Sequence, residues 1–133
     1  MSFFSKSFDP ATDLPDLSGK VVLITGGKYV THIHYWFAVD RLHSAGIGYS
    51  TVKHLARHGA KVYMAARNQS KAEAAIAQLK ADGLGPGNGE VIWLELDLVD
   101  PKNAKKAAEE FMKRETRLDI LSLYMFYVVG TWC

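Results

Sequence analysis

Glycines and small hydroxyl residues gather in two short segments of the N-terminal part of the chain. Thr25-Gly26-Gly27 ends an apolar run, and Ser44-Ala45-Gly46-Ile47-Gly48 begins a stretch with helical periodicity. At such a strand-to-helix turn backbone N–H groups converge, glycine lets a ligand approach the backbone, and the helix dipole favours negative charge. The pattern predicts a pyrophosphate site formed by Gly26, Gly27, Ser44, Ala45, Gly46, Ile47 and Gly48.

The next two apolar runs of the chain end at a charged residue that is followed by one further candidate residue. Four residues stand at these ends, and they are Arg67, Asn68, Asp97 and Leu98. In a dinucleotide site, a carboxylate after the second strand accepts the ribose hydroxyls, whereas an arginine there accommodates a 2′-phosphate through charge-assisted hydrogen bonds. Arg67 therefore predicts NADP rather than NAD as the cofactor. An ordinary surface arginine is the alternative.

Strand-like and helix-like stretches alternate along the chain. The β-branched run VVLIT is typical of a strand buried on both faces of a parallel sheet. The predicted strands are 21–25, 61–66, 91–98 and one beginning at 118–121, and the predicted helices are 47–58, 70–82 and one with Pro101 in its first turn. Elements in this order form parallel sheets with right-handed crossovers. The sequence thus predicts an α/β fold, a partial Rossmann-type doubly wound parallel sheet of about four strands with crossover helices.

Two of the predicted helices carry start signals. Ser70 and Glu73 have the spacing of a capping box, which predicts that the second helix begins at Ser70. Asp100 stands before Pro101 as the N-cap of the third helix. The residues predicted to face the sheet are Ala72, Ala75, Ile76 and Leu79 of the second helix and Ala104, Ala107, Ala108, Phe111 and Met112 of the third.

Composition is that of an ordinary globular chain. Of the 133 residues 48% are hydrophobic and 23% are charged, and the formal net charge is +2. Basic residues are interspersed with acids, so we predict no nucleic-acid partner. The apolar stretch 120–133 is shorter than the about 20 residues that a membrane span needs, so none is predicted. With one cysteine, Cys133, and no secretory signal at the N-terminus, the sequence favours a cytoplasmic location.

The two glycine segments resemble a known fingerprint when the sixteen residues between them are set aside. Joined in this way they read T-G-G-S-A-G-I-G, which resembles the T-G-x-x-x-G-I-G motif of the short-chain dehydrogenase/reductase family. The following GYSTVKHLARHGAKVYMAARN is also similar to that family, most closely to its retinol-dehydrogenase-like, fungal-type members. The resemblance covers residues 17–27 and 44–121.

The resemblance implies a function and a role for each matching position. The implied activity is that of an NADP-dependent oxidoreductase, which moves a hydride between the nicotinamide and an alcohol or carbonyl carbon of a small-molecule substrate. The implied roles are fingerprint glycines at Gly26, Gly46 and Gly48, phosphate neighbours at Ser44 and Ile47, and an adenine contact at Asp97 and Leu98. The expected partner is NADP(H), and the substrate belongs to the full-length parent enzyme.

Residues 28–43 depart from the family pattern because they interrupt the phosphate loop. A longer loop costs only about 1 kcal/mol of closure entropy, but its amides must still converge on one pyrophosphate. Codons for Gly27-Lys28-Tyr29 can contain a splice-donor sequence, so we interpret the segment as translated intron. A genuine inserted loop is the alternative. We predict no metal site at the histidines of this segment, which are His32, His34 and His43.

A second departure follows Leu121. There the family continues with an N-N-A-G turn, an active-site Ser and a Tyr-x-x-x-Lys motif, whose Tyr is the acid/base and whose Lys lowers the pKa of that Tyr. Tyr124 and Tyr127 have Val128 and Thr131 four residues later, so neither fits. We interpret both tyrosines as apolar filler and predict no catalytic residue in this part of the chain.

These departures predict a three-part organisation. We expect an N-terminal arm at 1–17, a truncated NADP-binding Rossmann domain at 18–121 and an aberrant apolar tail at 122–133. The predicted function is that of the NADP-binding half of a short-chain dehydrogenase/reductase, inactive as this chain. A non-enzymatic nucleotide-binding or interaction module is the alternative.

Overall fold

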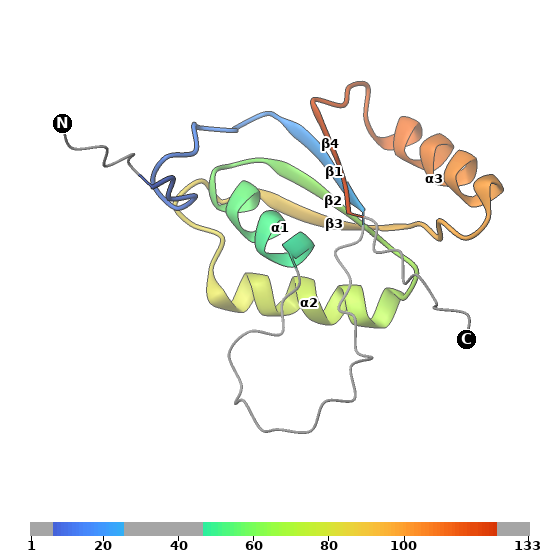
Figure 1. The fold of residues 1–133 in the computed structure, drawn as a ribbon, viewed down its shortest axis with the longest axis horizontal. Coiled ribbons are helices and arrows are strands. Elements are labelled where there is room, and N and C mark those ends of the chain that lie inside the picture. The colour runs from blue at the N-terminus through green and yellow to red at the C-terminus, as the bar shows by residue number, and fades with distance from the viewer. Residues whose placement is uncertain (1–6, 26–46, 125–133) are drawn as a thin grey trace, which may run out of the picture.

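The computed structural model describes residues 7–25 and 47–124, with the side chain of Ile47 left out (Figure 1). The strands in this part of the chain are β1 (Val21–Thr25), β2 (Lys61–Ala66), β3 (Glu90–Glu95) and β4 (Ile120–Leu123). The helices are α1 (Ile47–Arg57), α2 (Gln69–Asp82) and α3 (Pro101–Arg114). All neighbouring strands are parallel, in the order β3-β2-β1-β4. The predicted α/β fold with a parallel sheet and crossover helices is confirmed.

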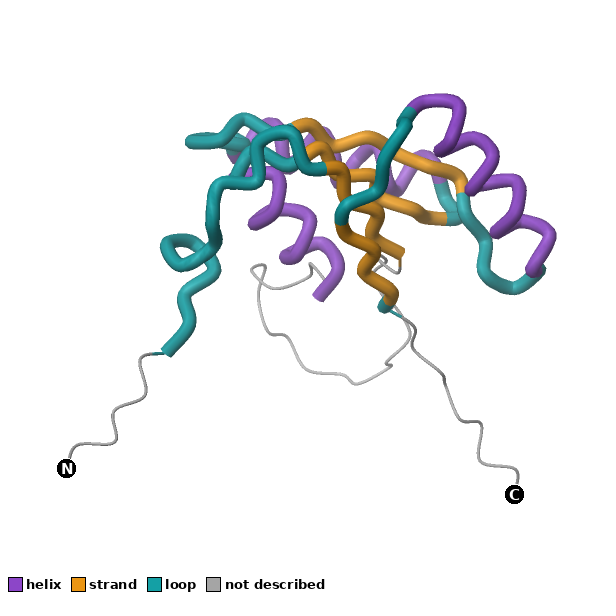
Figure 2. The backbone as a smooth tube through the Cα atoms, turned by 90° about the horizontal axis from the view of Figure 1, so that it is seen from above, coloured by secondary structure: helices purple, strands orange, loops and turns teal. Residues whose placement is uncertain are grey.

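The helices cover both faces of the sheet. Figure 1 and Figure 2 show α1 and α2 on one face and α3 on the other. The register aligns Val22 of β1 with Val62 of β2 and with Ile120 of β4. Because alternate residues of a strand point to opposite faces, β1, β2 and β3 supply two separate layers of the core, whereas the apolar residues of β4 are exposed.

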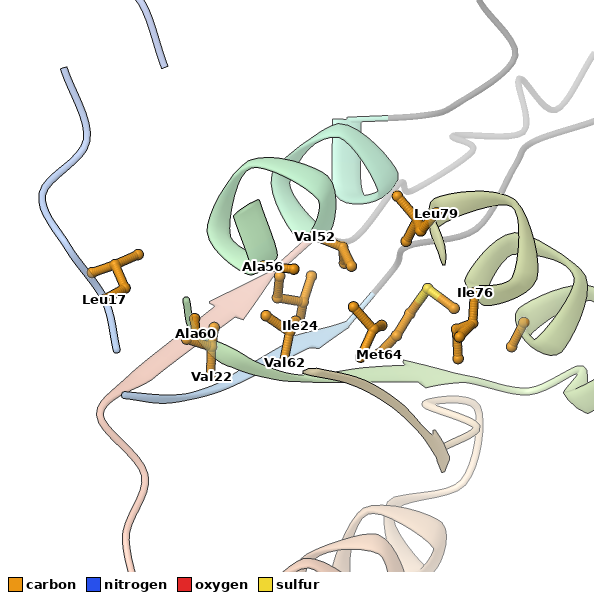
Figure 3. Close-up of a cluster of buried hydrophobic side chains, with 12 residues drawn as sticks. Leu17, Val22, Ile24, Val52, Ala56, Ala60, Val62, Met64, Ile76 and Leu79 are labelled. Carbon is orange, nitrogen blue, oxygen red and sulfur yellow. The ribbon is translucent and has the colours of Figure 1, made fainter. Parts of the chain in front are cut away.

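The larger core layer lies under α1 and α2. Val22 and Ile24 of β1 and Val62 and Met64 of β2 point toward the helices, as Figure 3 shows. The helices contribute Val52, Ala56, Ala72, Ile76 and Leu79, all buried. The apolar face predicted for α2 is confirmed, with Ala75 partly buried at its border.

The smaller core layer lies under α3. Tyr63 of β2 is 1% exposed, and its ring meets Phe111 edge-on, with centroids 5.0 Å apart and planes at 76°. Ala107 is the other buried residue of α3. The prediction that Ala104, Ala108 and Met112 also face inward is wrong, since all three are exposed. The reason is that α3 meets the sheet along one narrow line of residues spaced i, i+4.

The start of α2 also differs from the prediction. Its N-cap is Asn68, whose Oδ1 accepts hydrogen bonds from Lys71 N and Ser70 Oγ, each at 2.9 Å. Glu73 accepts instead from Gln69 Nε2 at 2.7 Å. The predicted capping box at Ser70 is therefore wrong, because Asn68 already has the extended backbone that an N-cap needs. The N-cap of α3 is Asp100, as predicted, with Pro101 in the first turn.

Two strand boundaries moved relative to the prediction. β3 ends at Glu95 and not at Leu98, because the chain turns at Asp97, whose Oδ1 accepts from Val99 N at 3.1 Å. β4 runs from Ile120 to Leu123, so the first two residues of the predicted tail belong to the sheet. The rest of that tail from 125 onward, and the predicted insertion at 28–43, lie outside the described residues.

The amino ends of the strands are tied together by polar contacts. The Asp119 carboxylate, just before β4, accepts from Val21 N of β1 at 2.9 Å and from both Nε and Nη2 of Arg117. These bonds hold the pKa of Asp119 well below its usual range. Beside β2, the Glu115 carboxylate accepts from the Tyr63 hydroxyl at 2.7 Å and pairs with Lys61 Nζ at 2.6 Å.

Candidate nucleotide-binding site

The sheet topology singles out one edge for ligand binding. From β1 the chain crosses to β2 and then to β3 on one side, and it returns to place β4 on the other side of β1. In open parallel sheets, ligands bind outside the carboxyl ends of the strands at the point where the strand order reverses. Here this point lies at the carboxyl ends of β1 and β4.

The predicted phosphate loop spans this point. Gly26, Gly27, Ser44, Ala45 and Gly46 lie outside the described residues. The structure does place the two flanks of the loop, since β1 ends at Thr25, α1 begins at Ile47, and Gly48 is buried in the first turn. The strand-to-helix turn predicted from the glycines is therefore framed by the elements expected.

Thr25 adds a polar atom at this edge. Its side chain is 2% exposed, and its Oγ1 has no hydrogen-bond partner among the described residues. A buried hydroxyl without a partner carries a desolvation cost, which a hydrogen bond to a ligand would remove. Thr25 is the last residue of β1, and the predicted loop follows it directly.

Arg67 follows β2 at the same edge. The carbonyl of Ala66 before it accepts from Trp93 Nε1 at 3.1 Å and from Leu96 N at 3.3 Å, which fixes the backbone there. Asn68 after it is held as the N-cap of α2. The Arg67 side chain is exposed, and its guanidinium has no hydrogen-bond or ion-pair partner within the described residues. A cation on a fixed backbone is thus available at the carboxyl end of β2.

The structure brings Arg67 and Asp97 together at a pocket of about 180 Å³. Its lining residues are Arg67, Glu95, Asp97, Asn103 and Lys106. Leu98 is 44% exposed and is not among them, and Asn68 uses its side-chain oxygen for the helix cap. Sequence reasoning missed Glu95, Asn103 and Lys106. Their positions along the chain could have indicated them. Glu95 ends β3, and Asn103 and Lys106 lie in the first two turns of α3.

A Tyr-x-x-x-Lys spacing also occurs at Tyr49 and Lys53 of α1. The structure argues against a catalytic pair there. Lys53 Nζ pairs with Asp82 at the far end of α2, at 3.7 Å. Burial, and then Asp82, raise the pKa of Tyr49, whereas an acid/base tyrosine needs a lowered pKa. Tyr49 packs against the larger core layer, which explains its place on the helix.

The sequence predicts Tyr124 to be apolar filler, whereas in the structure its hydroxyl has a hydrogen-bond partner. The Tyr124 Oη lies 3.0 Å from Thr51 Oγ1 of α1, and its ring packs against the larger core layer. Hydrogen bonds with the Thr51 and Ser122 side chains lower the pKa of the Tyr124 hydroxyl. The contact joins the end of β4 to α1, beside the point where the strand order reverses.

The sequence of this chain is similar to those of known short-chain dehydrogenases. A family model described as short chain dehydrogenase matches residues 43–124, more than half of the chain. A short-chain dehydrogenase/reductase of Armillaria gallica is 41% identical over 125 residues, which cover 90% of this chain and 34% of that protein. A short chain dehydrogenase/reductase of Gibberella zeae is 43% identical over 110 residues, covering 83% of this chain and 27% of that protein.

Solved structures agree with the fold. The RhlG/NADP active-site complex of Pseudomonas aeruginosa matches with a TM-score of 0.61 and 25% identity, over 82% of this chain and 35% of that one. A short-chain dehydrogenase/reductase from Serratia marcescens BCRC 10948 matches with a TM-score of 0.60 and 28% identity, over 87% of this chain and 40% of that one.

Fold and strand order define an α/β protein of the Rossmann type. The chain belongs to the short-chain dehydrogenase/reductase family, as its resemblance indicated, and it spans about a third of the length of the relatives it matches. The retinol-dehydrogenase-like subgroup stays a prediction. No helix among the described residues is long and apolar enough to cross a membrane.

Proposed function

We propose that this chain is the NADP-binding part of a short-chain dehydrogenase/reductase. The observation that carries the proposal is the free Arg67 guanidinium at the carboxyl end of β2, in one pocket with Asp97. A planar guanidinium binds phosphate oxygens in a bidentate way, and its backbone is already fixed on both sides. We assign Arg67 to the 2′-phosphate of NADP.

The other predicted residues have places consistent with this assignment. Asp97 would contact the adenine from the end of β3, where its Oδ1 bond to Val99 N orients the carboxylate. Gly48 lies buried in the first turn of α1, so the helix N-terminus can approach a pyrophosphate closely. The unpartnered Thr25 hydroxyl lies at the same turn. Gly26, Gly27, Ser44, Ala45, Gly46 and Ile47 complete the proposed loop.

Bound NADP(H) would supply hydride transfer to or from an alcohol or carbonyl carbon. The residues of this chain would hold the adenosine end and the pyrophosphate. At the carboxyl edge the described residues contain no Ser with a Tyr-x-x-x-Lys pair, because Tyr49 and Lys53 are directed into the α1–α2 side. We therefore propose coenzyme binding without turnover for these 133 residues.

The test is a titration of the full chain with NADPH and with NADH, followed by nicotinamide fluorescence. We expect the chain to bind NADPH more tightly than NADH. Arg67→Ala should lower the affinity for NADPH by about tenfold or more and leave the affinity for NADH nearly unchanged. Arg114→Ala is the matched control, since Arg114 lies at the far end of α3 and pairs with Glu110. Equal affinity for both coenzymes, or an NADPH preference that survives Arg67→Ala, would overturn the proposal.

A further inference from the structure

The charges of the Arg67 pocket pose a problem for a phosphate. Besides Arg67, the pocket is lined by two carboxylates, Glu95 and Asp97. A phosphate monoester carries about −1.5 to −2 charges at neutral pH, so two nearby carboxylates oppose its binding. One guanidinium against two carboxylates leaves the pocket formally negative. A second cation is needed to make it a phosphate site.

Lys106 provides that cation. It lies in the second turn of α3, lines the same pocket, and pairs with Glu95 through Nζ and Oε2 at 3.8 Å. Both side chains are largely exposed, at 76% and 67%, so the ion pair is weak and the lysine is free to exchange partners. The Lys106 ammonium therefore lies at the pocket and can bind a phosphate in place of Glu95.

We propose that Lys106 is a second phosphate-binding cation of this pocket and helps to set the preference for a 2′-phosphorylated nucleotide. The assignment rests on the proposed function. Arg67 binds the 2′-phosphate from the end of β2, and Lys106 approaches it from α3. When no phosphate is present, the Lys106 ammonium lies beside the Glu95 carboxylate. The cation comes from a different element than the one that sequence motifs normally identify.

The test compares two small ligands on the full chain, adenosine 2′,5′-bisphosphate and 5′-AMP, which differ only in the 2′-phosphate. Affinities are measured by calorimetry or by ligand NMR. We expect Lys106→Gln to lower the preference for the bisphosphate about threefold to tenfold, the size of one charge interaction across a solvated pocket. Binding of 5′-AMP and the midpoint of urea unfolding should not change.

Two further variants separate the proposed role from a general charge effect. Lys106→Arg keeps the charge and should keep the preference. Lys105→Gln removes the same charge one residue away, where the side chain is paired with Glu109 and does not line the pocket, and should have no effect. A preference lowered equally by Lys105→Gln and Lys106→Gln would overturn the proposal.

The outcomes also separate this inference from the proposed function. If Arg67→Ala abolishes the preference for the bisphosphate and Lys106→Gln leaves it intact, the NADP assignment stands and the inference is wrong. If the unchanged chain does not prefer the bisphosphate over 5′-AMP, both are wrong. A lowered preference in Lys106→Gln alone, restored in Lys106→Arg, supports the second cation.

Discussion

The two ends of the sheet are built differently. At the amino ends, charged side chains are paired with partners far away in the sequence, such as Asp119 with Val21 N and Glu115 with Lys61 and Tyr63. At the carboxyl ends, Arg67 has no polar partner among the described residues, and Glu95 has only the long, exposed pair with Lys106. The charged groups at the amino ends are satisfied within the fold, whereas Arg67 at the carboxyl ends is left available.

This difference separates stability from binding. Groups that are hydrogen-bonded within the fold contribute to the free energy of unfolding, and groups left free contribute little to it but can bind a ligand. We therefore expect substitutions at the amino ends to change stability, and substitutions at the carboxyl ends to change nucleotide affinity. The following predictions test that division, from the largest expected change in stability to the smallest.

Gly89, beside the amino end of β3, should be the most sensitive position. Its N–H donates to the carbonyl of Ala56 at 2.9 Å, and a Cβ there would lie inside van der Waals contact of the Ala56 and Ala60 carbonyl oxygens. Gly89→Ala should lower the free energy of unfolding by about 2–3 kcal/mol, measured by urea denaturation. Gly85→Ala is the control, since the nearest atom to its Cβ is 3.8 Å away. Equal effects of the two variants would contradict the prediction.

The Tyr63 hydroxyl should contribute next. Tyr63→Phe removes its hydrogen bond to the Glu115 carboxylate and should cost about 1–2 kcal/mol in the same assay. The pKa of Glu115, which Lys61 and Tyr63 both lower, should rise in the variant. Tyr49→Phe is the matched control, because the Tyr49 hydroxyl has no hydrogen bond to another described residue, and it should change stability by less than about 0.5 kcal/mol. If Tyr63→Phe left the free energy of unfolding unchanged, the hydrogen bond to Glu115 would not be stabilising.

Asp119 should make the stability of the fold depend on pH. Its folded pKa lies below its unfolded value of about 3.9, so its contribution is complete above that pH and is lost as the pH falls below about 4. Asp119→Asn should be less stable near neutral pH and should lose part of the acid-dependent decrease. Urea midpoints over a pH series measure both effects. An unchanged slope below about pH 4 would remove Asp119 from this role.

The smallest change in stability is expected at the carboxyl edge. Arg67→Ala should change the free energy of unfolding by less than about 0.5 kcal/mol, because the side chain is exposed and unpartnered within the described residues. The same variant has the largest expected effect on NADPH affinity. Loss of more than about 1 kcal/mol of stability would show that Arg67 has a structural partner and would blur the division between the two ends.

Much of the fold was predictable because it depends on neighbours along the chain. The run VVLIT and the run 61–66 became β1 and β2 with the bounds expected, and Asp100 with Pro101 began α3 as predicted. Periodicity, capping and strand propensity act over a few residues, so a single sequence reports them. The same holds for Arg67, since its place after a strand depends only on where β2 ends.

Competition between local signals was harder to predict. Asn68 and Ser70 both have side chains that suit an N-cap, and only the backbone entering α2 from β2 decided between them. The inward face of α3 was likewise overestimated. The sequence shows five apolar residues between 104 and 112, and only the packing of α3 on the sheet decided that Ala107 and Phe111 are the buried ones.

What the sequence determined by itself was the order of strands and helices and the arginine that directly follows β2. Tertiary structure alone decided which distant residues share a site. Lys106 reaches the pocket of Arg67 from α3, and Asp119 reaches the backbone of Val21 from before β4. Tyr49 and Lys53 match a catalytic spacing, yet packing directs them away from the carboxyl edge. The spacing of residues along a chain does not give their distances in space. A charge acts on groups within a few ångströms, and only folding brings distant residues that close.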